Sequence, residues 1–264
     1  MLFLLATAAG ACAPKRFSIP TNPGVPVGDH ATAWAAAAGS CLGVRTLTAE
    51  LALSGRAGDT RMRGRVQAGF EAPGRIRLEG VAPFGQPVFI LAGDGAQATL
   101  LLPRDERVVT APGAAEILEA LAGVRLDADA LRAVLTGCVF SDPPTGATGH
   151  GGIARFAFAG GAVYVERRSN VSRIVAGETQ SFLIEYPDAF AGSAFPRRVR
   201  ISRGAAVGDA VDITIAMSQI ETNIDLPVAA FTIDIPPGTR PMTIADLRAA
   251  GPLGTRNQNQ NQNP

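Results

Sequence analysis

Apolar residues alternate with polar or small residues along most of this chain, and the alternation limits the possible folds more than any other feature. A period of two places neighbouring side chains on opposite faces of a β-strand. Strands with one apolar and one polar face are typical of an antiparallel sheet that is solvated on one side. The sequence therefore predicts one long antiparallel sheet. Its strands fall near residues 47–53, 62–70, 76–78, 156–158, 163–165, 182–186, 199–201, 211–217 and 231–235.

Short helical segments accompany these strands. Asp29 is a suitable N-cap for an Ala-rich helix that ends near Leu42 and has Trp34 as its only large anchor. Amphipathic patterns over 114–122 and 127–135 suit the apolar face of a sheet. A sheet of about 10–11 strands must curl. We therefore expect a mainly β fold, an unclosed half-barrel whose concave apolar face is covered by short helices.

A curled sheet under a helical lid encloses an apolar cavity unless its inner side chains fill the space. A packed core is the alternative, and the sequence leaves both open. The residues expected to line the cavity or to face it from the lid are all apolar and fall on the inward side of their elements. They are Ile76, Leu78, Phe89, Leu100, Ile117, Leu118, Leu121, Leu131, Val134, Leu135, Phe156, Phe158, Phe182 and Ile184.

The first 12 residues form a short apolar run that ends in small residues and Cys12. The run is too short to span a membrane and has the character of a secretory signal segment. It resembles a bacterial lipoprotein signal, which implies that residues 1–11 are removed and that Cys12 is acylated. The alternative is an ordinary signal peptide with a chance cysteine. Residues 12–28 are rich in Pro and Gly and predict an extended tether that could reach about 50 Å.

The segment Pro83-Phe84-Gly85 predicts a stiff turn with a large apolar residue at its tip. An exposed apolar tip indicates contact with a bilayer or an acyl chain. The alternative is that Phe84 folds back into the core. The tip hypothesis expects Phe84→Glu to leave folding unchanged and to impair lipid transfer.

Cys41 and Cys138 remain if Cys12 is acylated. Two cysteines in an oxidising compartment can form a disulfide, whereas two buried free thiols are the alternative. The net charge of +1 gives no indication of nucleic acid as a partner. Residues 252–264 end in an Asn/Gln repeat and predict a disordered tail after a domain that spans 29–251.

Motifs for catalysis are weak in this sequence. His150 lies in a His-Gly-Gly loop, but no Gly-x-Ser-x-Gly elbow supplies a nucleophile. The two histidines, His30 and His150, and the three cysteines do not have the spacing of a zinc site. We therefore expect a binding protein with no metal, no cofactor and no catalytic residues.

The order of elements resembles the LolA/LolB-type periplasmic carriers of lipoproteins. Three segments carry the resemblance: 77–85, like that family's strand and Pro-Leu-Gly turn, and 113–123 and 126–137, like its two lid helices. With a terminal cysteine, the chain is most similar to the LolB branch, whose members are themselves lipoproteins. The chain departs from the family pattern by its extra length after Gly137 and by Phe84 in place of Leu.

The resemblance implies an outer-membrane lipoprotein, at the periplasmic face, that binds acyl chains in its cavity. Its partners would be acylated lipoproteins or other lipids, a LolA-type soluble carrier and the outer membrane. Phe84 falls on the position that helps insertion in that family. Two alternatives stay open: a module for another amphiphile, such as a glycolipid or hydrophobic metabolite, and a structural envelope lipoprotein with a filled core.

Overall fold

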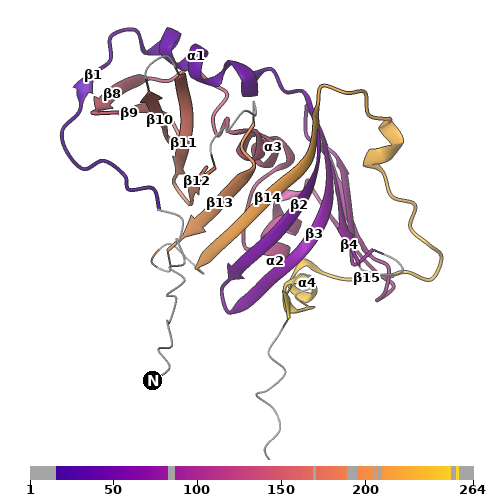
Figure 1. Ribbon diagram of the computed structural model, residues 1–264. Coiled ribbons are helices and arrows are strands. Elements are labelled where there is room, and N and C mark those ends of the chain that lie inside the picture. The colour runs from indigo at the N-terminus through magenta and orange to yellow at the C-terminus, as the bar shows by residue number, and fades with distance from the viewer. Residues whose placement is uncertain are drawn as a thin grey trace, which may run out of the picture.

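The computed structural model describes residues 16–82, 87–168, 171–188, 195–204, 206, 210–250 and 254–255. These residues form one large open sheet with short helices against its concave side (Figure 1). The strand order is β1-β8-β9-β10-β11-β12-β13-β14-β2-β3-β4-β5-β6-β7-β15, and β16 pairs with β3. Because this order is linear, the two ends of the sheet do not meet, and the half-barrel expected from the sequence is unclosed.

The bounds of the elements are as follows. The strands are β1 (Val25–Pro26), β2 (Thr46–Ala57), β3 (Thr60–Glu71), β4 (Arg75–Val81), β5 (Ile90–Asp94), β6 (Ala98–Leu102), β7 (Arg107–Ala111), β8 (Gly146–His150), β9 (Ile153–Phe158), β10 (Gly161–Arg168), β11 (Val171–Thr179), β12 (Leu183–Glu185), β13 (Arg198–Arg203), β14 (Val211–Thr222), β15 (Arg240–Pro241) and β16 (Gly254–Thr255). The helices are α1 (His30–Leu42), α2 (Ala115–Ala122), α3 (Ala128–Thr136), α4 (Ile244–Ala250) and the 3₁₀ helix η2 (Val228–Phe231).

The longest strands lie side by side at the centre of the sheet. β2 and β3 have 12 residues each and form a hairpin. β14 pairs with the other side of β2, so segments more than 150 residues apart in the chain become neighbours. The alternation seen in the sequence sets the faces: Leu51 and Val66 are buried, whereas Arg63 and Ser54 point outward.

Two sets of helices cover the concave side. α1 lies over the wing formed by β8 to β11, where Trp34 contacts the rings of Phe156 and Phe158 at centroid distances of 5.6 and 5.0 Å. α2 and α3 lie over the other wing (Figure 1). α2 also packs against α4, whose Leu247 is fully buried. The apolar stripes of the helices therefore meet the apolar face of the sheet, as expected for a single core.

Several sequence-based expectations about single segments were wrong. Residues 231–235 are not a strand: the chain ends η2 at Phe231 and continues without regular structure. Phe231 is buried, but Ile235 is 49% exposed, so the alternation there does not reflect a sheet. His150, expected in a loop, ends the strand β8, because the backbone of residues 146–150 pairs with β9 and β1 although their Gly and Thr side chains give no strand pattern.

The sheet also has more strands than expected and is not wholly antiparallel. In the described residues it contains 16 strands, and the additional ones are mostly short edge pairings such as β1 and β15. β15 pairs with β7 in parallel. No helix in this part of the chain is long and apolar enough to cross a membrane.

Candidate functional site: an apolar cavity under a two-helix lid

An apolar cavity of about 80 Å³ lies between the concave face of the sheet and the helices α2 and α3. Every described residue that lines it is apolar, and no polar side chain from this part of the chain reaches into it. The lining residues come from β2, β3, β4, β13 and β14, from the segment before β5, from the two helices and from the connection between them. They are Leu51, Leu53, Met62, Val66, Leu78, Phe89, Leu118, Leu121, Ala122, Val124, Leu126, Leu131, Ile201, Ile213 and Ile215.

The sequence predicted five of these lining residues: Leu78, Phe89, Leu118, Leu121 and Leu131. The other predicted residues are buried in the same core but do not line the cavity; they are Ile76, Leu100, Ile117, Val134, Leu135, Phe156, Phe158, Phe182 and Ile184. Phe156 and Phe158 lie beneath α1, because β9 belongs to the other wing of the sheet.

The residues that were missed fall into two classes. Met62, Ile213 and Ile215 lie on inward positions of alternating strands, so their register was readable from the sequence. Their place at the cavity follows from β14 pairing with β2, which no local pattern predicts. Val124 and Leu126 lie between the two helices, where there is no periodicity to read.

Polar contacts and a covalent bond attach α3 to its surroundings. Cys138, just after α3, is joined by a disulfide to Cys41 of α1, with a Cα–Cα distance of 5.7 Å. Asp129 accepts a hydrogen bond from the backbone N–H of Gly74 at 2.8 Å. Tyr186 donates its hydroxyl hydrogen to the Val134 carbonyl at 3.0 Å, and burial raises the pKa of this tyrosine far above its usual value.

Helix α2 is attached differently. Its apolar residues pack against β7 and α4, and the side-chain hydrogen bond described for it goes to Arg125. Its carboxylates, Glu116 and Glu119, pair with Arg125 in the α2–α3 connection at 3.7 and 2.9 Å. These pairs are local and solvent-exposed and therefore contribute little. α3 is thus the fixed part of the lid, and α2 is the part that can separate from the sheet at the lower free-energy cost.

Three of the residues that line the cavity are partly exposed, Leu53, Ala122 and Leu126, and we take them as its mouth. A polar pocket of about 560 Å³ shares Leu121 with the cavity. Arg203 and Arg248 are among the residues that line it. The apolar cavity therefore has a polar pocket beside it, an arrangement that suits an amphiphile.

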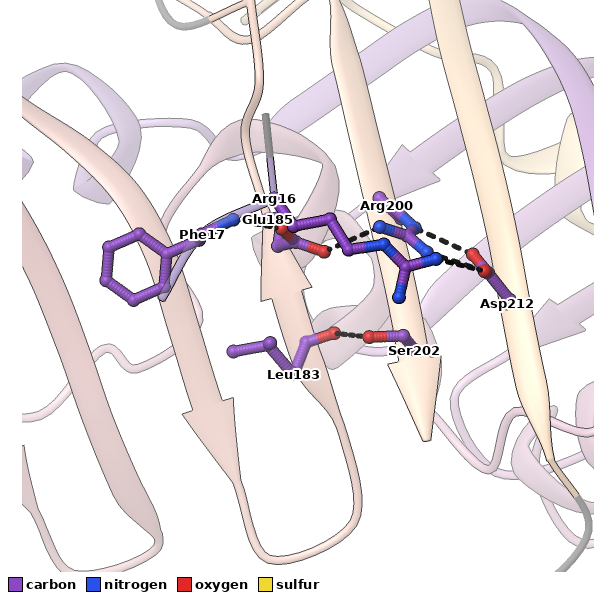
Figure 2. A network of polar contacts seen from close by, with 7 residues as sticks. All are labelled: Arg16, Phe17, Leu183, Glu185, Arg200, Ser202 and Asp212. Carbon is purple, nitrogen blue, oxygen red and sulfur yellow. Dashed lines mark hydrogen bonds and ion pairs between the residues drawn. The ribbon is translucent and has the colours of Figure 1, made fainter. Parts of the chain in front are cut away.

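A second polar assembly fixes the start of the described chain on the outer face of the sheet (Figure 2). The backbone N–H of Phe17 donates to Glu185 at 2.7 Å, and its ring lies 5.0 Å from the ring of Tyr164. Arg200 donates to the other oxygen of Glu185 at 3.2 Å and to both oxygens of Asp212 at 2.7 and 2.5 Å. Glu185 is only 6% exposed, so its charge is satisfied by these donors.

This assembly changes the expectation for residues 16–28. The sequence predicted an extended tether, but Arg16 forms an ion pair with Asp212 at 3.6 Å and Val25–Pro26 pairs with β8. Pro residues have no backbone N–H, and an extended Pro-rich segment has no internal hydrogen bonds. Such a segment can therefore lie against the domain without changing its conformation. The described part of the segment is therefore attached to the domain.

The ion pair between Arg200 and Asp212 makes the stability of the protein depend on pH in the acid range. The hydrogen bonds from Arg200 hold the pKa of Asp212 below its usual value. Because the pKa is lower in the folded than in the unfolded state, the ionised carboxylate stabilises the fold at pH values above the unfolded-state pKa, which is near 4. This stabilisation is lost as the pH falls through the folded-state pKa. We expect Asp212→Asn to lower the free energy of unfolding at pH 7 by up to about 1 kcal/mol, since the side chain is half exposed.

Urea unfolding at several pH values tests this expectation. The difference between wild type and Asp212→Asn should shrink as the pH falls below about 4. A difference that stays constant from pH 7 to pH 3 would show that the ionised carboxylate does not contribute through this pair.

Some predicted site residues lie outside the described part of the chain: Cys12, Pro83, Phe84 and Gly85. Their proposed roles stay predictions. No group of histidine, cysteine or carboxylate side chains with the geometry of a metal site occurs among the residues that the structure describes.

No protein-family model and no curated protein matches this sequence. Among solved structures, the chain is similar to a LolA superfamily protein from Nitrosomonas europaea, with 11% identity and a TM-score of 0.49 over 78% of this chain and 99% of that one. It is also similar to a DUF1329 family protein from Desulfovibrio piger, with 11% identity and a TM-score of 0.48 over 78% of this chain and 98% of that one. Both similarities concern the course of the chain and assign it to no family.

Proposed function

We propose that this protein binds acyl chains under its helical lid and, like LolB, transfers acylated lipoproteins at the outer membrane. The observation that carries the proposal is the wholly apolar cavity beneath α2 and α3, with a mouth at Leu53, Ala122 and Leu126. Acyl chains bind by transfer of apolar surface out of water, worth about 0.8 kcal/mol for each CH₂. Such a site has no need of a polar group inside.

The cavity volume requires the lid to open when a ligand enters. Sites for small molecules typically have volumes of roughly 300–1,000 Å³, whereas this cavity has about 80 Å³. The structure therefore corresponds to a closed, unliganded state in this proposal. Movement of α2 away from the sheet supplies the missing volume, because α3 is attached by the disulfide and its hydrogen bonds.

Acyl binding is tested with the purified protein in two steps. Mass spectrometry of an organic extract should identify co-purified acyl lipids, and a fluorescent fatty-acid probe should bind and be displaced by them. We expect Leu53→Glu, which places a carboxylate at the apolar mouth, to weaken probe binding at least about tenfold. Val228→Glu, at a residue 63% exposed and away from the cavity lining, is the matched control and should bind as wild type does.

The small cavity favours one other function, a structural envelope lipoprotein with a filled core. In that case the extract contains no stoichiometric lipid, and the probe binds neither wild type nor the control. A module for a glycolipid or hydrophobic metabolite would instead be shown by the identity of the extracted molecule.

The proposed anchor is tested at Cys12. Two acyl chains are needed for firm attachment to a bilayer. We therefore expect Cys12→Ser to move the protein from the outer-membrane fraction to the soluble or unprocessed fraction, without loss of acyl binding by the purified chain. A Cys12→Ser protein that still fractionates with the outer membrane would show that this residue is not the anchor.

A further inference from the structure

The outer face of the central sheet carries two columns of arginines separated by small residues. On β3, Arg61, Arg63 and Arg65 occupy successive outward positions. On β13, Arg198 and Arg200 do the same. β14 and β2 lie between these two strands, so the columns are three strand spacings apart, about 14 Å.

Strand register shows what lies between the columns. Arg198 pairs with Ala216, which pairs with Ala52, which pairs with Arg65. One step along the sheet, the row is Arg200, Thr214, Ser54 and Arg63. Short side chains therefore form the floor, and arginines form the walls.

Arg63, Arg65 and Arg198 line a shallow trough of about 980 Å³ over these short side chains, with Val81 and Val88 at one rim. Arg61 lies just beyond its end, in a pocket that shares Arg63 with it. We call the trough together with Arg61 the arginine trough. Val81 is 41% exposed, so the rim presents an apolar side chain next to the cationic wall.

The charges of the trough are only partly compensated. Arg65 lies 3.8 Å from Glu50, Arg198 lies 2.9 Å from Asp188, and Arg200 is held by Asp212 and Glu185. Arg61 and Arg63 are exposed and have no carboxylate partner in the described chain.

We propose that the arginine trough docks on the phosphate groups of an anionic bilayer. A guanidinium matches phosphate with paired hydrogen bonds, and it is weakly hydrated compared with an ammonium group. An exposed apolar residue beside cationic side chains is suited to the boundary between headgroups and acyl chains. Small floor residues leave room for headgroups between the two walls.

The position of the chain start favours a bilayer over an acidic protein as the occupant. Arg16 pairs with Asp212, which is two residues before the floor residue Thr214 on β14 and points to the same face. An acyl anchor at Cys12 is four residues from Arg16 and therefore no more than about 14 Å from it. This step rests on the proposed function, because it requires the anchor; the charge pattern itself does not.

Vesicle sedimentation tests the proposal. All variants are made in the full chain carrying Cys12→Ser. This substitution removes the acyl anchor, so the variants differ only in the contribution of the tested arginines to vesicle binding. Vesicles contain phosphatidylcholine alone or with 30 mol% phosphatidylglycerol. Each arginine near an anionic surface is worth about fivefold in binding. We expect Arg61→Gln/Arg63→Gln to weaken binding to the anionic vesicles about 25-fold and to leave binding to neutral vesicles unchanged.

The matched control removes two exposed arginines elsewhere. Arg45 and Arg240 are both exposed and lie outside the trough lining. Arg45→Gln/Arg240→Gln should bind anionic vesicles within about twofold of the parent chain. Raising the salt from 0.05 to 0.5 M should weaken parental binding, because counter-ions screen exposed charges.

Three results would overturn the proposal: equal loss in the two double variants, no preference of the parent for anionic vesicles, or trough-dependent binding to polyglutamate without binding to vesicles. The last result would identify an acidic protein as the partner. Fatty-acid probe binding, measured on the same variants, separates the two hypotheses. If the protein binds the probe but the trough substitutions do not change vesicle binding, only the docking surface is refuted. If the trough substitutions weaken vesicle binding but the protein does not bind the probe, only acyl carriage is refuted.

Discussion

Replacing Cys41 and Cys138 together by alanine is expected to lower the free energy of unfolding by up to about 4 to 5 kcal/mol. The disulfide joins positions 97 residues apart, and the entropy that a cross-link removes from the unfolded chain grows with the length of the loop. Both cysteines are at most 5% exposed, so their loss also leaves small cavities in the core.

Urea unfolding of the oxidised protein at pH 7 measures this change. The fully reduced wild-type chain is the matched control, because it lacks the cross-link but keeps both side chains. If the double variant unfolds within about 1 kcal/mol of the oxidised wild type, the bond does not contribute through the loop it closes. The fold should persist in either case, since α3 is also attached through Asp129 and Tyr186.

The sequence predicted the faces of the sheet better than its edges. Alternation along 47–53 and 62–70 defines which side chains point inward, and the long hairpin of β2 and β3 follows from it. The amphipathic stripes of α2 and α3 are likewise local properties, and Ile117, Leu118, Leu131 and Val134 are buried as that pattern requires. Local periodicity decides burial because each side chain has only two faces or one stripe to occupy.

Long-range placement could not be predicted in the same way. The cavity depends on β14 lying next to β2. The position of Phe17 depends on β12 and β13, which bring Glu185 and Arg200 together. β8 and β15 are held by backbone pairing, which any sequence without proline at the donor positions can make. Such features have no periodic signal, and they decide where the candidate site is built.

A reversible cross-link between β2 and the end of α2, in the polar pocket beside the cavity, should abolish acyl binding. A Cβ atom added at Gly123, at the C-terminal end of α2, would lie 3.3 Å from the Cβ of Ala57 at the end of β2 and 3.2 Å from Cγ2 of Val211, which has to shift by a few tenths of an ångström. Cβ atoms joined by a disulfide are about 3.5–4.5 Å apart, so small shifts allow Ala57→Cys/Gly123→Cys to form one. The bond would hold the end of α2, next to Ala122, against the end of β2.

Gly123 has a positive φ of 68°, so a side chain there carries a strain of about 1–3 kcal/mol. Gly123→Ala has the same strain without the cross-link and should bind the fatty-acid probe nearly as wild type does. The oxidised double variant should lose probe binding at least about 100-fold, and a thiol reductant should restore it. Wild type treated with the same reductant controls for the bond between Cys41 and Cys138, which is buried.

The outcome distinguishes a moving lid from a static one. The closed cavity of about 80 Å³ is too small for an acyl chain, so binding at the site needs α2 to separate from the sheet. If the oxidised variant binds the probe with wild-type affinity and rate, the C-terminal end of α2 does not open. Acyl chains would then have to enter elsewhere, and the mouth at Leu53, Ala122 and Leu126 would not be the route of entry.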